Sequence, residues 1–332
     1  MTKIVHFSQL SKSSADDLAG ESLDSDLTGG VVSIGNFDGV HRGHRALLGE
    51  VTQQAKHIGA PTIAVIFDPH PTAILRPELA PERLTWVERR GELMGQVDID
   101  FLLVVETTAE FLSLSAEAFF QSLIVEQLQA KAIVEGPNFF FGRGRTGNVD
   151  TLAALCQQNQ IRFTIAQPTL SDDQLISSTR IRNLLQNGSI DQANQFLGTS
   201  YCIRGQVVTG QQRGRTIGFP TANLADVDVV IPGHGVYGGM VTIDGKDYDA
   251  AIHIGPNPTF GDSSSKIEVH VLDFHGDLYQ TQLVVSFVSF VRDVVKFDSA
   301  EHLTAQLKRD VTTIRDQLTL HRAAASAGNS GT

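Results

Sequence analysis

The chain has 332 residues, a net charge of −11, and 41% hydrophobic against 19% charged residues. Because single cores stop growing at about 250–300 residues, this length predicts two domains. The acidic balance argues against a general nucleic-acid binder, which needs a basic surface. Cys156 and Cys202 have no CxxC spacing, which excludes a disulfide framework or cysteine-based zinc site, and we expect both to be buried.

The sequence does not predict a membrane protein. Residues 1–6 show no signal-peptide pattern, and the longest clean apolar run, residues 101–105, is too short to span a bilayer. These features favour a cytoplasmic protein.

Strand-like and helix-like segments alternate from residue 31 to residue 197. Val31–Ile34 is typical of a buried strand that runs into a glycine-rich turn, and a helix begins at about Gly43. Further strands are expected at residues 62–67, 101–105, 132–134 and 162–165. This alternation predicts an α/β domain with a doubly wound, Rossmann-like parallel sheet. Ligands of such sheets bind at the carboxyl ends of the strands, where residues 35–44 lie.

A serine-rich segment opens the next helix, at residues 177–188, and a short helix follows at residues 191–197. Strand-like stretches at residues 203–208, 237–243, 266–272 and 283–288 then predict an antiparallel sheet or small β-barrel. A terminal helix is expected at residues 299–320. We therefore expect a first domain at 1–186, a linker or helical connection at 187–200, a second domain at 201–320 and a disordered tail at 321–332.

The segment His41-Arg42-Gly43-His44 follows a strand and opens a helix. Two histidines three residues apart project to the same side of the first turn, and the helix start offers free N–H groups. Such a cradle suits a polyphosphate, and nucleotidyl transfer requires positioned phosphates without a protein nucleophile. Two alternatives stay open: ordinary structural histidines, or a metal site, for which no third ligand is obvious.

A second glycine-rich loop spans residues 210–223. It lacks the ending of a Walker A loop, but its backbone N–H groups and Arg215 can wrap phosphates. Thr221 and Asn223 offer hard oxygen ligands of the kind Mg²⁺ prefers, although this stretch can equally be a turn. Three Arg-x-Arg pairs, at residues 143–145, 180–182 and 213–215, also suggest anionic ligands or solvated surface.

The ordered set of motifs resembles one family. Residues 35–44, 67–71, 136–142 and 176–182, followed by residues 214–223, 235–237, 254–260 and 267–274, are similar to the motifs of the prokaryotic bifunctional riboflavin kinase/FMN adenylyltransferases, also called FAD synthetases. The resemblance implies a nucleotidyltransferase domain followed by a kinase domain that is a small antiparallel β-barrel. It also implies Mg²⁺ as cofactor, ATP as substrate, and riboflavin, FMN and FAD as substrates and products.

The resemblance also implies site residues. The adenylyltransferase ATP site would comprise Gly35, Phe37, Asp38, His41, Gly43, His44, Asn138, Ser177, Ser178, Thr179 and Arg182, with His41 and His44 catalytic. The kinase ATP site would comprise Gly214, Arg215, Gly218, Pro220, Thr221 and Asn223, with Mg²⁺ on Thr221 and Asn223. Glu268 would be the general base that takes the proton of the riboflavin 5′-hydroxyl. Asp68, His70 and Arg292 would contact flavin.

Three positions depart from the family pattern. Val294 stands where an acidic residue is usual, Phe140 replaces a polar residue, and His253 occupies a place where a small residue is common. We still expect both activities, with small-molecule partners only, no nucleic acid, no membrane, and a monomer or weak homo-oligomer. The alternatives are a monofunctional adenylyltransferase whose second domain is a weak kinase or only binds flavin, and a non-catalytic flavin or nucleotide sensor.

Overall fold

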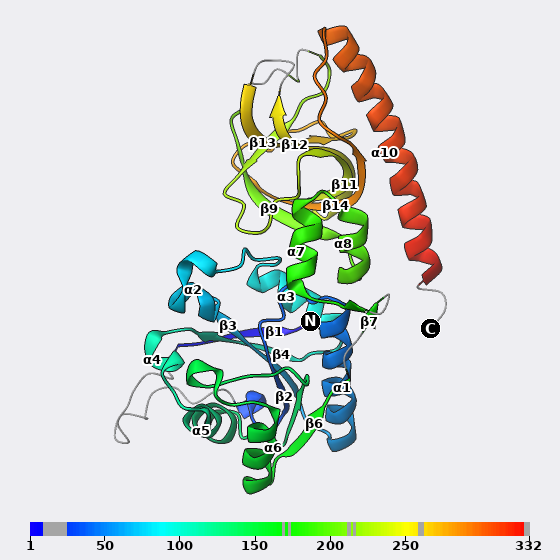
Figure 1. Ribbon diagram of the computed structural model, residues 1–332. Helices are drawn as coiled ribbons and strands as arrows, with labels where there is room; N and C mark the ends of the chain where they lie inside the picture. The colour runs from blue at the N-terminus through cyan, green and yellow to red at the C-terminus, as the bar shows by residue number, and fades with distance from the viewer. Residues whose placement is uncertain are drawn as a thin grey trace. The chain divides into compact units, whose positions relative to one another are not determined.

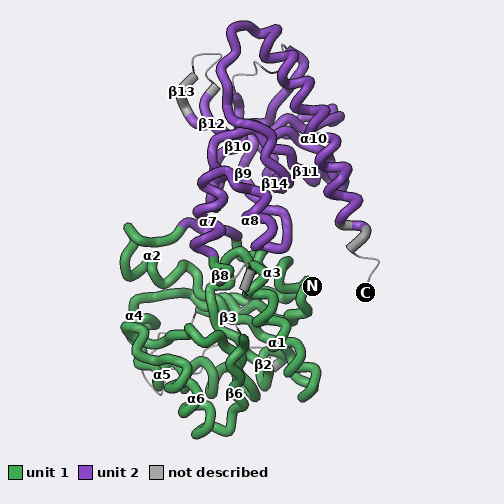
Figure 2. The backbone as a smooth tube through the Cα atoms, turned by 45° about the vertical axis from the view of Figure 1, so that its right-hand side comes forward, with its two compact units in different colours: residues 1–81, 86–177 green, residues 82–85, 178–332 purple. Residues whose placement is uncertain are grey.

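The computed structural model describes residues 1–8, 25–167, 170–171, 174–210, 214, 217–257 and 262–328. The chain forms two compact units, coloured separately in Figure 2. Unit 1 comprises Met1–Pro81 and Trp86–Ser177, and unit 2 comprises Glu82–Thr85 and Ser178–Thr332. Among the described residues, no helix has the length and apolar character needed to cross a bilayer.

Unit 1 is built on one parallel sheet of six strands in the order β1-β4-β3-β2-β5-β6 (Figure 1). The strands are β1 (Lys3–Phe7), β2 (Val31–Ile34), β3 (Thr62–Asp68), β4 (Phe101–Glu106), β5 (Ala132–Glu135) and β6 (Arg162–Ile165). The chain moves outward from β2 to β3 and β4, and β5 and β6 lie on the other side. The strand order therefore switches direction between β2 and β5, where such sheets bind ligands.

Helices cover both faces of this sheet. Alternate strand residues pack with α1 (Arg42–Ile58) and α3 (Val87–Gly95) on one face. The opposite face packs against α4 (Ala109–Leu112), α5 (Ala116–Phe119), the π-helical η3 (Phe120–Gln127) and α6 (Val149–Gln158). Leu48, Val51 and Ala55 carry the buried stripe of α1 because they share one side of the helix. The shorter elements are η1 (Ser25–Leu27), α2 (Pro71–Leu75), η2 (Pro77–Leu79), η4 (Arg143–Arg145), β7 (Leu170–Ser171) and β8 (Gln174–Leu175).

Unit 2 is a closed barrel of six antiparallel strands in the order β10-β13-β12-β11-β14-β9. The strands are β9 (Tyr201–Val208), β10 (Ala222–Ala225), β11 (Gly235–Ile243), β12 (Lys246–Asn257), β13 (Asp262–Val271) and β14 (Gln282–Arg292). In the described part of unit 2, the barrel is accompanied by the helices α7 (Ser178–Gln186), α8 (Ile190–Leu197) and α10 (Ala300–Gly328). Helix α10 runs along the outside of the barrel (Figure 1). Its Ile314 and Leu318 are fully buried and pack with Leu272 and Val288.

The predicted fold class, a doubly wound parallel sheet followed by a small antiparallel barrel with a terminal helix, is confirmed. The end of the terminal helix is a correction, because α10 continues past the expected residue 320 to Gly328. The continuation is rich in alanine, which has the highest helix propensity. Residues 329–332 of the expected tail lie outside the described residues.

Candidate active sites

The loop between β2 and α1 brings His41 and His44 together. His41 is the N-cap of α1, and its Nδ1 accepts a hydrogen bond from the backbone N–H of His44 at 3.2 Å. The two imidazole rings stack with centroids 3.6 Å apart and planes 16° apart. Phe37 packs edge-on against His44, with ring centroids 5.3 Å apart. Gly43, two residues after His41, has no side chain, and a Cβ there would lie 3.2 Å from the His41 ring.

The environment of His44 keeps its ring neutral. Burial lowers the pKa of His44 well below its ordinary value, and the nearby charges of His41 and Arg90 lower it further. Within the described part of the chain, the buried Nδ1 of His44 has no hydrogen-bond partner. Since an unsatisfied buried nitrogen is costly, this atom is a candidate contact for a bound ligand.

Arg90 of α3 lies against the same loop, although no sequence motif includes it. Its side chain is 5% exposed, and its guanidinium donates to the Asn36 carbonyl and to the Asp38 carboxylate, each at 3.3 Å. Asp38, predicted to bind ATP, is itself nearly fully buried. Its carboxylate therefore holds the loop through Arg90, and a contact with ATP stays a prediction.

A cavity of about 390 Å³ opens at the carboxyl ends of β2, β3 and β5. Its polar lining includes Asn36, His70 and Asn138, and the side chains of Asn36 and His70 lie 2.7 Å apart. Much of the remaining lining is aromatic, and its phenylalanines are Phe67, Phe111, Phe119, Phe139, Phe140 and Phe141. Such a slot can accept a flat, largely apolar ring with one polar end. Of the two flavin contacts predicted in this region, Asp68 and His70, it is His70 that lines the cavity.

Arg145, one of the predicted anion-binding arginines, lines this cavity. The Arg145 guanidinium lies over the Phe140 ring, 4.8 Å from its centroid, and Phe140 remains 46% exposed. This cation–π contact gives the unusual aromatic residue at position 140 a local partner. Arg143 begins the short helical turn η4, and Gly142 before it and Gly144 within it have φ angles of 72° and 64°.

Glu135 is a buried carboxyl at the switch point between β2 and β5. It is 2% exposed, and its Oε1 accepts the backbone N–H of Ile34 at 2.5 Å. Burial raises the pKa of Glu135 well above its ordinary range, against the lowering effect of hydrogen bonds from the amides of Ile34 and Gly136. The sequence carries a signal for this residue, since an acidic side chain directly follows the apolar strand residues 132–134.

The serine-rich segment is divided between the units. Ser177 ends unit 1, whereas Ser178, Thr179 and Arg182 belong to α7 of unit 2. There the Nε of Arg182 donates to the backbone carbonyl of Glu82 at 2.6 Å. The part of these residues in an ATP site stays a prediction.

In unit 2, the barrel aligns the predicted metal ligand and the predicted base. Asn223 of β10 is the direct cross-strand neighbour of Glu268 in β13, and Glu268 is in turn opposite His253 of β12. Side chains at directly opposed positions of a sheet share one face. Burial lowers the pKa of His253, while the Glu268 charge and the carbonyls of Pro256 and Gly255 act to raise it and Arg292 lowers it.

Thr221 and Asn223 line a cavity of about 370 Å³ together with Pro220. The Pro220 carbonyl lies 2.7 Å from Nδ1 of His270, which ties this loop to β13. Two positions of this loop favour glycine. Gly218 has a φ of 82°, and a Cβ on Gly214 would meet the Phe219 carbonyl. Arg215, with Arg213 and Thr216, lies outside the described residues.

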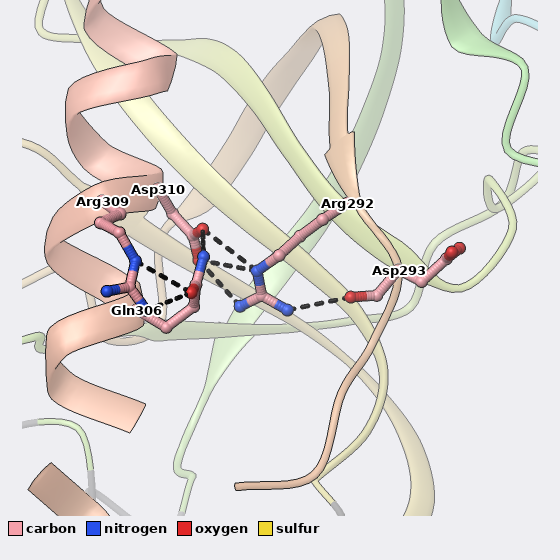
Figure 3. A network of polar contacts seen from close by, with 5 residues as sticks. All are labelled: Arg292, Asp293, Gln306, Arg309 and Asp310. Atoms are coloured by element: carbon pink, nitrogen blue, oxygen red, sulfur yellow. Dashed lines mark hydrogen bonds and ion pairs between the residues drawn. The ribbon is translucent and has the colours of Figure 1, made fainter. Parts of the chain in front are cut away.

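Arg292, predicted to contact flavin, is held by an ion pair with Asp310 of α10 (Figure 3). Its Nε and Nη2 reach the Asp310 carboxylate at 2.8–3.1 Å, and Nη1 donates to the Asp293 carbonyl at 2.9 Å. Gln306 also donates to Asp310, at 2.8 Å. A flavin contact by Arg292 stays a prediction.

The described residues hold no group of three or more histidine, cysteine, aspartate or glutamate side chains that could bind a metal ion. The His41–His44 pair thus finds no third ligand of these types there. Thr221 and Asn223 are oxygen donors of another kind, which suit a cation that keeps water and phosphate ligands.

Comparison with known proteins matches both halves of the chain. The FAD synthetase family model matches residues 23–180, and the riboflavin kinase model matches residues 197–318. The bifunctional riboflavin kinase/FMN adenylyltransferase of Pseudomonas fluorescens is 37% identical, covering 86% of this chain and 92% of the relative. The corresponding Escherichia coli K12 enzyme is 35% identical, covering 87% and 92%. A crystal structure described as a macrolide-efflux protein from Streptococcus pneumoniae has a TM-score of 0.79 and 31% identity, covering 89% of this chain and 96% of that chain.

Proposed function

The chain belongs to the family of bifunctional riboflavin kinase/FMN adenylyltransferases, and we propose that each of its two units carries one of the two reactions. It is an enzyme of FAD biosynthesis. Riboflavin and ATP give FMN and ADP, and FMN and ATP give FAD and pyrophosphate. The observation that carries the assignment of the second reaction to unit 1 is the stacked His41–His44 pair at the start of α1.

In unit 1, a phosphate oxygen of FMN attacks the α-phosphorus of ATP, and pyrophosphate leaves. His41, His44 and the free N–H groups at the start of α1 hold the phosphates and stabilise the charge that develops on them. The neutral His44 ring offers a nitrogen that has no hydrogen-bond partner among the described residues. The aromatic cavity takes the isoalloxazine ring, and Asn36, His70 and Asn138 of its lining offer polar contacts. Asp68 is carried into this proposal by the family resemblance.

In unit 2, Glu268 accepts the proton of the riboflavin 5′-hydroxyl as its oxygen attacks the γ-phosphorus of ATP, and ADP leaves. The cross-strand alignment of Asn223 with Glu268 supports this role, because it puts the base beside the residue that faces the nucleotide. The cavity lined by Pro220, Thr221 and Asn223 accommodates the nucleotide. This arrangement favours an active kinase over a domain that only binds flavin.

The oxygen donors Thr221 and Asn223 fit a magnesium ion. Gly210 leaves space for the Asn223 amide, which a Cβ at that position would overlap. When bound, Mg²⁺ would neutralise charge on the ATP phosphates. Replacement of Asn223 by Ala should raise the Mg²⁺ concentration needed for half-maximal kinase activity while leaving adenylyl transfer unchanged, and an unchanged Mg²⁺ requirement would remove Asn223 from the site.

Substitution of His44 tests the assignment of unit 1. His44→Ala should stop FAD formation from FMN and leave FMN formation from riboflavin at the wild-type rate, both followed by chromatographic separation of flavins. His57→Ala is the matched control, because His57 is exposed on the same helix. FAD formation by His44→Ala at the control rate would show that the site lies elsewhere.

The remaining assignments concern the setting of the enzyme. It acts in the cytoplasm on free small molecules, as a monomer or weak homo-oligomer. Sedimentation velocity over a range of protein concentrations should give a species near 36.0 kDa that dominates at low concentration. A stable larger species at every concentration would contradict this assignment.

A further inference from the structure

Arg90 makes two separate contacts with the loop that carries the proposed ATP-binding histidines. Its Nη1 donates to the Asn36 carbonyl and its Nη2 to the Asp38 carboxylate. These acceptors belong to the residues before and after Phe37, so the two N–H groups of one planar guanidinium fork connect both sides of that residue. A guanidinium can donate in two fixed directions at once, which a lysine ammonium cannot do in the same geometry.

The bridged loop has an unfavourable backbone. Phe37 and Val40 have φ angles of 45° and 38°, in a region that residues with a Cβ rarely adopt, and Val40 is β-branched. Such conformations are strained and persist only when surrounding contacts fix them. Besides Arg90, the fixing contacts include the buried Phe37 side chain and a hydrogen bond from Arg45 Nε to the Val40 carbonyl at 3.2 Å.

The charge of Arg90 is already balanced within the protein. Its partner Asp38 carries the opposite charge, and both side chains are at most 7% exposed. The pair as a whole therefore adds little net attraction for a polyphosphate. Arg90 is close enough to His44 for its charge to lower the pKa of that ring.

We propose that Arg90 is a positioning residue for adenylyl transfer, whose fork holds the 36–38 segment so that His41 and His44 keep their stacked arrangement toward the ATP phosphates. The inference rests on the proposed role of His41 and His44. It assigns no proton or phosphate contact to Arg90 itself. Arg90 contributes by holding the 36–38 segment in place through the geometry of its fork.

Arg90→Lys separates geometry from charge, because it keeps the positive charge and loses the fork. Arg89→Lys is the matched control: Arg89 is the preceding residue of α3, and its guanidinium pairs with Glu92 on the same helix at 2.8 Å. Misplacement by about 1 Å can cost roughly 100-fold in rate, so we expect Arg90→Lys to lower kcat for FAD formation by about 10- to 100-fold. KM for ATP should change less than kcat, and Arg89→Lys should match wild type.

Riboflavin kinase activity of the same chain measures the amount of intact protein in each assay. Circular dichroism during heating establishes that unit 1 is folded at the assay temperature. A kcat for FAD formation equal to that of Arg89→Lys would overturn the inference. A loss that disappears when kcat is divided by the fraction of folded unit 1 would overturn it as well.

A double-mutant cycle with Asp38→Asn tests whether the two residues act as one device. If Arg90 works through Asp38 and Asn36, the double variant should lose little more than the more severe single variant. Multiplicative losses would show independent roles and refute the inference. His44→Ala separates the proposed site from the proposed role of Arg90. If His44→Ala spares FAD formation, the proposed site is wrong. If His44→Ala abolishes FAD formation and Arg90→Lys does not reduce it, only the role of Arg90 is refuted.

Discussion

The Arg292–Asp310 ion pair connects the last barrel strand to α10, and replacing Asp310 by Asn should destabilise unit 2 (Figure 3). The Asp310 side chain is 3% exposed and accepts three contacts from Arg292 and one from Gln306. Asparagine keeps the shape but removes the charge and one acceptor oxygen. The Arg292 guanidinium is then left partly buried without its counter-charge.

Removing one partner of a buried ion pair costs about 3–5 kcal/mol. Arg292 is 20% exposed and keeps its hydrogen bond to the Asp293 carbonyl, which favours the lower end of that range. For a unit of this size, about 3 kcal/mol corresponds to a fall in Tm of roughly 6–12 °C.

The assay is the loss of riboflavin kinase activity after heating, recorded alongside thermal unfolding by circular dichroism. Adenylyl transfer from added FMN reports on unit 1 and should keep its temperature dependence. Asp316→Asn is the matched control, since Asp316 is an exposed position of α10. A Tm for Asp310→Asn within about 2 °C of the control would refute the reasoning, because it would mean that the pair contributes less than about 1 kcal/mol.

Three further outcomes follow from buried groups. Because the pKa of Glu135 is raised, unit 1 should lose stability as pH rises from 4.5 toward the folded-state pKa, and Glu135→Gln should flatten this dependence in denaturant titrations at several pH values. Gly239→Ala should lower the Tm of unit 2, because a Cβ there would meet the Ser286 carbonyl and Ile252, as thermal unfolding can measure. The Cys156 thiol, whose pKa burial raises to about 12, should resist iodoacetamide at pH 8 until unit 1 unfolds, as followed by mass spectrometry.

Local patterns were sufficient to predict the arrangement of His41 and His44, because one short segment decides it, whereas their role in binding ATP stays a prediction. A buried strand, a glycine-rich turn and a helix start place His41 at the N-cap and His44 one turn later. Their stacking follows from the three-residue spacing. The strand alternation around Glu268 likewise indicated which face it occupies, and the barrel register then aligned it with Asn223.

Contacts that join distant segments left little local trace. Arg90 lies 54 residues from Asn36, and nothing in its own helix marks it as a partner of that loop. Asp310 had a weaker sequence signal, since it shares a helix side with the buried Ile314 and Leu318. The short strand β10 was missed because its four residues overlap a stretch that reads as a turn.

The ends of elements were also hard to predict. The terminal helix runs eight residues beyond the expected end at residue 320, because no proline or helix-stopping glycine interrupts it before Gly328. The first strand, β1, has polar residues at Lys3 and His6 and gains its stability by pairing with β4. Propensity alone therefore did not reveal it.

The central claim is that the two reactions occur in separate halves of one chain, and Glu268→Gln tests it most directly. The variant is assayed twice, with riboflavin and Mg-ATP for FMN, and with FMN and Mg-ATP for FAD. We predict that FMN formation is lost, because the base can no longer accept the 5′-hydroxyl proton, while FAD formation from FMN proceeds at the wild-type rate. Undiminished FMN formation, or equal loss of both products from folded protein, would contradict the account.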